Sequence, residues 1–188
     1  MDNELLRRMC ELERDASFPG ELAKPVKMLV LDVDGVLTDG GLYYSDEGLA
    51  LKRFDVQDGL GIKLAQRAGI EVVIISGMES PALMARAKDL GIAECHAGVF
   101  RKLPKLEGIM AARGVSWHEV AYVGDDVIDL PILRRAGLAL AVKNAQPEIR
   151  AAVHYVAPCG GGAGGARWLI RHILLAQGRL SAILADFL

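Results

Sequence analysis

Three aspartates follow a short apolar run near the start of the chain, and their spacing suggests chemistry. The run "KMLVL" leads directly into "DVDGVLTD", which places Asp32, Asp34 and Asp39 within eight residues. The run predicts a strand buried on both faces, because it is short, apolar and bounded by polar residues. Carboxylates at the exit of such a strand are held in place, where they can bind a cation, transfer protons or attack an electrophile.

Polar residues also stand at the ends of other apolar runs. In an open α/β sheet, ligands bind at the carboxyl ends of the strands, so residues at these exits are expected to converge on one crevice. Besides the aspartates after the first run, the residues concerned are Ser76 and Gly77 after "EVVII", Lys102 before "LPKLEGIM", and Asp125, Asp126 and Asp129 after "VAYVG".

Each of these groups also has an ordinary structural explanation. The sequence Asp34-Gly35 is typical of a turn, and Ser76 could begin a loop. Lys102 alone could be a solvated surface lysine, and Asp125 could cap a helix. Together, however, crowded carboxylates repel one another and resist burial unless a cation compensates them. Oxygen ligands without His or Cys partners indicate Mg²⁺, and Mg²⁺ with a hydroxyl, a lysine and backbone amides suits a phosphoryl group.

The segments that carry these residues predict an α/β fold. "KMLVL", "IEVVIIS", "EVAYVG" and "LALAV" are short and apolar and predict strands. Helices are predicted over residues 58–69, 80–91 and 103–114, and the second has Ser80 as N-cap and Gly91 beyond its end. Alternating strands and helices indicate a doubly wound, Rossmann-like parallel sheet with helices on both faces.

Several segments fall outside that alternation. "GGLYYSDEGLALKRF" has strand-forming residues on either side of "SDEG" and predicts a β-hairpin inserted directly after the first strand. Residues 1–25 predict an amphipathic helix and a linker, residues 26–180 the main domain, and residues 181–188 a C-terminal tail. The glycine-rich "PCGGGAGGA" predicts irregular structure, whereas "RWLIRHILLAQG" after it predicts a helix.

Composition and charge exclude several classes of function. The chain has 188 residues, 52% of them hydrophobic, and a formal net charge of -2 with acids and bases interspersed. This balance gives no bulk charge for recognising a nucleic acid or a membrane surface, and no apolar run is long enough to span a bilayer. Three cysteines are an odd number without metal-site spacing, which favours reduced thiols and a cytoplasmic location.

The ordered motifs resemble those of the haloacid dehalogenase-like phosphatases. "LDVDGVLTD", "IISG", Lys102 and "GDDVIDL" match four motifs of that family in order, each at a predicted strand end. "DVDGVLTDGGLYY", "KRFDVQDGLGIKLA" and "AGVFRKL" further resemble a subfamily without a large cap domain, as do "AYVGDDVIDLP" and "LLAQGRL". The resemblance covers residues 27–180. It implies a phosphatase for a phosphorylated eight-carbon 2-keto-3-deoxy sugar acid, in the synthesis of lipopolysaccharide precursors.

The resemblance implies roles in phosphoryl transfer for several of these residues. Asp32 would attack phosphorus and form an aspartyl-phosphate. Asp34 would protonate the leaving oxygen and then deprotonate the attacking water. Ser76 and the Gly77 amide would hold phosphate oxygens, while Lys102 would offset the negative charge of the nucleophile and of the transferring group.

The resemblance also implies a bound Mg²⁺ ion. The ion would be held by Asp32, the backbone carbonyl of Asp34, and Asp125. Asp126 and Asp129 would order the water molecules of the metal or the catalytic lysine.

A homotetramer is a further expectation. An isolated two-stranded hairpin is marginal in water, and the hairpin over residues 41–54 has too much apolar surface to leave exposed. Its apolar residues are Leu42, Tyr43, Tyr44, Leu49 and Leu51. The resemblance supplies the tetramer and implies that a neighbour's hairpin and C-terminal tail help to close the site. The alternative is a hairpin folded onto its own domain.

The sequence departs from the family pattern at positions that would grip the substrate. Met78 stands where the family usually has an arginine after the Ser/Thr-Gly pair, and Ala163 replaces a basic residue in the glycine-rich tail. Trp168 replaces a glutamate, although Arg167 persists as a candidate substrate ligand. Met78 itself can offer only an apolar contact. Either another base supplies the missing charge, with Arg167, Lys52 and Arg53 as candidates, or the enzyme binds the sugar acid weakly.

These departures leave the substrate open between the eight-carbon acid, a nine-carbon acid phosphate and small phosphosugars. Two other classes of protein also fit parts of the pattern, namely a phosphoacceptor signalling domain and an inactive structural homologue. In signalling domains the acidic pair comes first and the lysine last, and no second carboxylate is needed two residues after the acceptor. The order of the motifs and the presence of Asp34 therefore favour a hydrolase.

Overall fold

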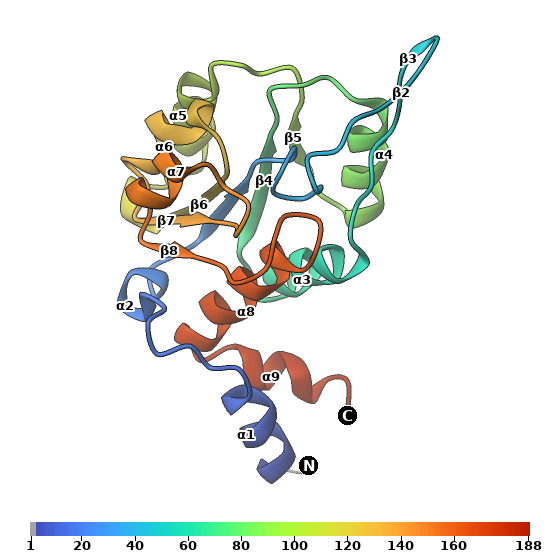
Figure 1. Cartoon of the computed structure of the whole chain (residues 1–188). Helices are drawn as coiled ribbons and strands as arrows, with labels where there is room; N and C mark the ends of the chain where they lie inside the picture. The colour runs from blue at the N-terminus through green and yellow to red at the C-terminus, as the bar shows by residue number, and fades with distance from the viewer. Residues whose placement is uncertain (1–2) are drawn as a thin grey trace.

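Six parallel strands form one sheet in residues 3–188, the part of the chain that the computed structural model describes (Figure 1). The order from edge to edge is β5 (Glu94–His96), β4 (Glu71–Ile75), β1 (Met28–Leu31), β6 (Val120–Gly124), β7 (Leu138–Ala141) and β8 (Tyr155–Val156). Within the sheet, the chain runs from β1 outward to β4 and β5, and then returns to β6 on the other side of β1. This is the order of a Rossmann-like sheet, so the predicted doubly wound α/β fold is confirmed.

Helices cover both faces of the sheet and form two apolar layers with it. Side chains alternate along each strand, so Leu31 of β1 enters one layer and Val30 enters the other. The first layer includes α3 (Val56–Arg67), α4 (Pro81–Leu90) and α8 (Gly165–Ala176). The second includes α5 (Lys102–Arg113), α6 (Leu130–Leu133) and α7 (Pro147–Ala152). Burial on both faces holds the central strands rigidly and fixes the residues at their ends.

The predicted helix and strand limits agree closely with the structure in the core. The four strands predicted from apolar runs are confirmed as β1, β4, β6 and β7. Helix α4 begins where expected, because the Ser80 hydroxyl accepts a hydrogen bond from the Leu83 N–H at 3.3 Å, and it ends at Gly91 with a φ of 70°. The sequence does not predict β5 or β8, because both are too short to give an apolar run. Short 3-10 helices lie on either side of β6, at Trp117–Glu119 (η1) and Val127–Asp129 (η2).

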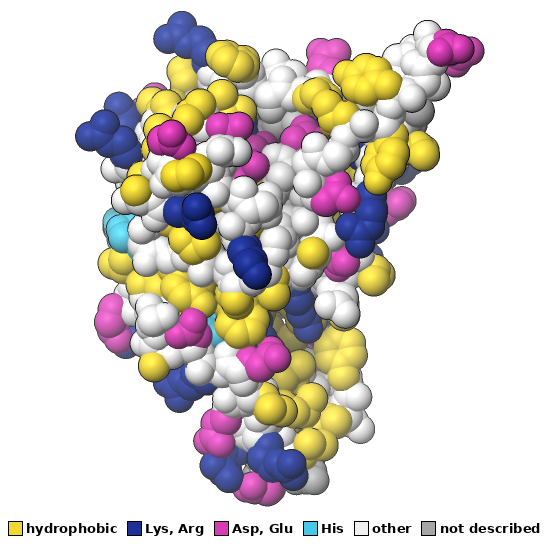
Figure 2. Space-filling model, viewed as in Figure 1, with side chains coloured by type: hydrophobic (Ala, Val, Ile, Leu, Met, Phe, Trp, Pro, Cys, Tyr) yellow, Lys and Arg dark blue, Asp and Glu magenta, His cyan; other side chains and the backbone are white. Residues whose placement is uncertain are grey.

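The predicted hairpin follows β1 and projects from the body of the molecule (Figure 1). It consists of β2 (Tyr43–Ser45) and β3 (Gly48–Leu51), which pair with each other in a separate two-stranded sheet. Tyr44 is 68% exposed and Leu51 66% exposed in the single chain. Figure 2 shows hydrophobic side chains on this arm below its acidic tip. The side chain of Leu49, part of the predicted apolar set, lies outside the described part of the structure, as do those of Asn3 and Ala50. Within residues 3–188 the hairpin is the only insertion between β1 and α3, so no large cap domain is present there.

The first and last helices of the described residues lie together at the end of the molecule opposite the hairpin (Figure 1). There α1 (Asn3–Glu11) packs against α9 (Leu180–Ala185), and α2 (Gly20–Ala23) packs against α8. The side chain of Asp15 accepts a hydrogen bond of 2.6 Å from the Tyr155 hydroxyl, which ties the N-terminal segment to β8. The domain limits at residues 26 and 180 stay a prediction. No helix within residues 3–188 is long and apolar enough to cross a membrane.

Candidate active site

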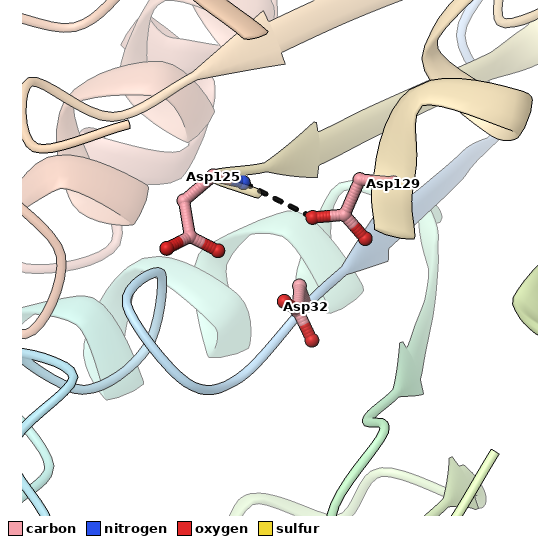
Figure 3. Close-up of side chains that lie close together, drawn as sticks. All are labelled: Asp32, Asp125 and Asp129. Atoms are coloured by element: carbon pink, nitrogen blue, oxygen red, sulfur yellow. Dashed lines mark hydrogen bonds between the residues drawn. The ribbon is translucent and has the colours of Figure 1, made fainter. Parts of the chain in front are cut away.

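Three carboxylates meet where the strand order of the sheet reverses. Asp32 follows β1, and Asp125 and Asp129 follow β6, the neighbouring strand. One oxygen from each lies within 4.8 Å of the others (Figure 3). Asp32 and Asp129 are buried, and Asp125 is half-buried. The strand exits therefore converge as the sequence predicts, at the place where open α/β sheets bind their ligands.

A buried lysine faces two of the three carboxylates. Lys102 is the first residue of α5, and its Nζ lies 2.7 Å from Asp32 Oδ1 and 2.8 Å from Asp129 Oδ1. Its side chain is fully buried. One ammonium group therefore offsets part of the charge of a cluster of three acids.

Asp129 is held by protein donors on both of its oxygens. Oδ1 accepts a hydrogen bond of 2.6 Å from the Tyr122 hydroxyl as well as the one from Lys102, and Oδ2 accepts one of 3.1 Å from the Asp125 N–H. Asp125 differs, because its buried Oδ1 has no hydrogen-bond partner within the described residues. Asp129 thus fixes its neighbours, and Asp125 offers the oxygen that is free for a ligand.

Burial and mutual repulsion change the protonation of the cluster. Burial raises the pKa of Asp125 to about 8, and the charges of Asp32 and Asp129 add to the effect. Burial and then the charge of Asp129 raise the pKa of Asp32 to about 6, although Lys102 opposes the change. For Lys102, burial would lower the pKa, but the two adjacent carboxylates outweigh it and the pKa is raised.

The cluster therefore lacks positive charge, and a divalent cation would supply it. The donors are oxygens, and the free Asp125 Oδ1 points to a missing partner. Hard oxygen donors and compact carboxylates suit Mg²⁺, so the residues present fit the ion that the sequence predicts.

Asp34 lies apart from the three clustered acids. Its Oδ1 pairs with Lys52 Nζ at 2.5 Å, and its Oδ2 lies 3.5 Å from the Ser76 hydroxyl. Gly35 has a φ of 90°, and a Cβ at this position would collide with the carboxylate of Asp125. Glycine is therefore required for the turn that sends Asp34 in a different direction from Asp32.

The loop after β4 contributes the hydroxyl near Asp34. Ser76 is fully buried, and its Oγ accepts a hydrogen bond of 3.2 Å from the Met78 N–H. Gly77 and Met78 are half-buried beside it. All three residues therefore lie at the same edge of the sheet as the carboxylates.

Two other predicted site residues, Asp126 and Arg167, lie outside this group, and so does Trp168, where the sequence departs from the family pattern. Asp126 is exposed, and its carboxylate accepts a hydrogen bond of 2.6 Å from the Val127 N–H at the start of η2. The Arg167 N–H donates to Asp58 Oδ1 at 2.8 Å, and within residues 3–188 its side chain makes no hydrogen bond or ion pair with the cluster. Trp168 Nε1 donates to the Tyr155 hydroxyl at 3.2 Å, away from the carboxylates. The contribution of Asp126 and Arg167 to the site stays a prediction.

Two contacts in the site were not predicted from the sequence. Asn144 bridges two loops, because its Nδ2 donates to the Gly35 carbonyl at 2.9 Å and its Oδ1 accepts from the Gly161 N–H at 2.7 Å. Asn144 follows the run "LALAV", so the rule of strand exits could have found it. The contact between Lys52 and Asp34 has no such signal, because Lys52 follows the hairpin.

The fold and the site together define a haloacid dehalogenase-like hydrolase. The sequence model of that family matches residues 97–164. The chain is 42% identical over 156 residues to the 3-deoxy-D-manno-octulosonate 8-phosphate phosphatase KdsC of Haemophilus influenzae. The match covers 83% of this chain and 87% of that protein. It is 40% identical over 158 residues to KdsC of Escherichia coli K12, with 84% of each chain covered.

A solved structure of a phosphatase named for the same activity is also similar to this chain. The 3-deoxy-D-manno-octulosonate 8-phosphate phosphatase of Moraxella catarrhalis, crystallised with magnesium, phosphate and KDO, superposes with a TM-score of 0.87 at 38% identity. The match covers 90% of this chain and 97% of that one. The chain therefore belongs to the KdsC family of haloacid dehalogenase-like phosphatases.

We expect Mg²⁺ to stabilise the protein against unfolding, and Asp125→Asn to remove most of this effect. A ligand that binds only the folded state at about 100 times its Kd adds about 2.7 kcal/mol of stability. Thermal unfolding in chelator and in excess Mg²⁺ measures the difference, with Asp89→Asn on the exposed face of α4 as control. Equal stabilisation of all three proteins by Mg²⁺ would contradict a site at this cluster.

Proposed function

We propose that the protein hydrolyses 3-deoxy-D-manno-octulosonate 8-phosphate to the free sugar acid and inorganic phosphate in a Mg²⁺-dependent reaction. The observation that carries the proposal is the buried cluster of Asp32, Asp125 and Asp129 around Lys102 at the reversal of strand order. The KdsC relatives at 40–42% identity, which carry this activity in their names, support the choice of substrate.

In the first step, a carboxylate oxygen of Asp32 attacks the phosphorus atom. The bond between phosphorus and the sugar oxygen breaks, and its electron pair stays on that oxygen, which takes a proton from Asp34. The products are the free sugar acid and an aspartyl-phosphate on Asp32. Lys102, 2.7 Å from Asp32, orients the nucleophile and offsets its charge.

In the second step, water attacks the phosphorus atom of the aspartyl-phosphate. Asp34, now ionised, takes a proton from the water as the bond between phosphorus and the Asp32 oxygen breaks. Inorganic phosphate leaves, and both aspartates return to their starting forms. Asp34 is suited to both roles because it lies apart from the cluster, on the side of Ser76.

Asp32, the backbone carbonyl of Asp34, and Asp125 would hold the Mg²⁺ ion. When bound, the ion would neutralise charge on the phosphoryl oxygens and draw them toward the nucleophile. We assign Asp129 to the support of Lys102, because both of its oxygens already accept hydrogen bonds from the protein. Asp126 would act on the metal's water molecules from the solvent side.

The phosphate would be held by Ser76 and by the Gly77 N–H. The Ser76 hydroxyl is fully buried at the edge of the sheet where Asp34 lies, so it is preorganised to donate to a phosphate oxygen. Met78 follows at the rim, where the sugar acid would lie.

Arg53 is the base best placed to replace the missing charge in the sugar-acid site. Its Nη1 donates to the Gly162 carbonyl at 2.8 Å, next to Ala163, where the family pattern has a basic residue. About half of its side chain is exposed, so it remains available to a substrate carboxylate. Arg167 is the less favoured alternative, since its contacts lie with α3.

We propose a homotetramer assembled through the hairpin. The support is the exposed apolar arm, on which Tyr44 and Leu51 are each about two-thirds exposed in the single chain, while β2 and β3 form a sheet of their own. A cytoplasmic location also stays a prediction, based on the three unpaired cysteines.

We expect Asp32→Asn to abolish turnover, because an amide is a poor nucleophile. Asp34→Asn should lower kcat by about 10²–10⁴-fold, the usual contribution of general acid and base catalysis. The rate of phosphate release from the sugar-acid phosphate in the presence of Mg²⁺ measures the effect of both substitutions. Near-normal phosphate release by Asp32→Asn would overturn the proposed chemistry.

We expect Met78→Arg to lower KM for the sugar-acid phosphate, because an arginine can pair with its carboxylate. A charged hydrogen bond typically contributes about 1.5–3 kcal/mol, which is about ten- to a hundredfold in binding. The KM for p-nitrophenyl phosphate, which has no carboxylate, should change little. Equal shifts on the two substrates would remove residue 78 from the account of specificity.

We expect the wild-type protein to sediment as a tetramer, and a variant with Tyr44→Lys and Leu51→Lys to dissociate at the same concentration. Charges on the arm would resist burial in an interface. Leu12→Lys is the matched control, because Leu12 is 64% exposed on the opposite end of the molecule. A wild-type monomer at all concentrations in analytical ultracentrifugation would refute the assembly.

A further inference from the structure

A second buried lysine faces the second aspartate of the predicted pair. Lys52 belongs to the segment that leads from β3 to α3, and its side chain is only 1% exposed. Its Nζ lies 2.5 Å from Asp34 Oδ1. An ammonium group is buried at a large cost unless it is paired, so the contact with Asp34 is what stabilises the lysine in this position.

The contact makes the two oxygens of Asp34 different. Oδ1 is occupied by Lys52, whereas Oδ2 faces the Ser76 hydroxyl at a distance of 3.5 Å. In the proposed reaction Ser76 holds the phosphate, so Oδ2 is the oxygen on the substrate side. A carboxylate free to rotate would present either oxygen, or neither, to the leaving group.

Each of the two mechanistic aspartates thus has its own lysine. Lys102 comes from α5 and binds Asp32, and Lys52 comes from the segment between β3 and α3 and binds Asp34. The two lysines approach from elements that are far apart in the sequence. The nucleophile and the proton-transfer group are therefore oriented independently of each other.

We propose that Lys52 is a positioning residue that holds Asp34 with Oδ2 toward the leaving oxygen of the substrate. The inference rests on the proposed function, since it assigns Lys52 a part in the proton transfer of that reaction. Lys52 acts on the leaving group through Asp34, and it leaves the attack by Asp32 unchanged.

The leaving group provides a test that a purely structural lysine would not pass. A sugar alkoxide needs a proton as it departs, whereas p-nitrophenolate is stable without one. In a single turnover, Lys52→Met should therefore lower the rate of sugar-acid release by about ten- to a hundredfold, the range of a charged hydrogen bond, and change the rate of p-nitrophenolate release little. Single-turnover release reports the first step alone, before Asp34 acts as the base in the second step that both substrates share. The KM of the sugar-acid phosphate should stay near the wild-type value. Lys63→Met, an exposed lysine of α3, is the matched control and should alter neither substrate.

A double-mutant cycle separates action through Asp34 from other effects. If Lys52 acts by positioning Asp34, then adding Lys52→Met to Asp34→Asn should cause no further loss of kcat. Full additivity of the two losses would overturn the proposal. So would an equal loss in single-turnover release from both substrates, or a rise in KM alone, which would indicate that Lys52 binds the substrate directly.

A conservative variant covers the case in which Lys52→Met does not fold. Lys52→Arg keeps the charge but moves the donor, and it should show the same selective loss on the sugar-acid phosphate to a smaller degree. An equal loss in single-turnover release from both substrates would again overturn the role of Lys52. A wild-type enzyme without activity on either substrate would instead overturn the proposed function itself.

Discussion

The site depends on holding three acidic side chains closer together than their charges favour. The sheet supplies the necessary force, because β1 and β6 are neighbours in register and the Asp32 N–H donates to the Val123 carbonyl at 3.1 Å. Apolar layers on both faces keep these strands from moving apart. The backbone is adapted to the crowding as well, since a Cβ at Gly124 would lie 2.5 Å from Asp129 Oδ2. The packed core therefore holds the three carboxylates together against their electrostatic repulsion, which would push them apart on a flexible loop.

Much of this arrangement could be predicted from the sequence. The features that could not be predicted lie in segments that leave no periodic pattern in the sequence. Buried strands give short apolar runs, so their exits, and with them Asp32, Ser76 and Asp125, can be read from the pattern. Edge strands such as β5 and β8 are too short to leave that signal. The pairing of Lys52 with Asp34 depends on the path of an irregular segment, which has no periodicity.

The departure from the family pattern at Trp168 has a structural explanation in the N-terminal extension. The indole ring packs against His172 with ring centroids 4.5 Å apart, and its Nε1 donates to the Tyr155 hydroxyl at 3.2 Å. That hydroxyl in turn donates to Asp15. A glutamate at residue 168 would lack the ring that packs there. In this chain the position serves to fasten the N-terminal segment around Asp15 to α8 and β8.

The place of the two chain ends has a practical consequence. Both lie beside α1 and α9, at the far end of the molecule from the hairpin and from the loops that follow β1 (Figure 1). An affinity tag, a fluorescent reporter or a linker to a solid support could be joined ahead of α1 without covering the active site of the same chain. The same position of α1 allows a second enzyme to be fused ahead of it, while the active site stays accessible to small molecules.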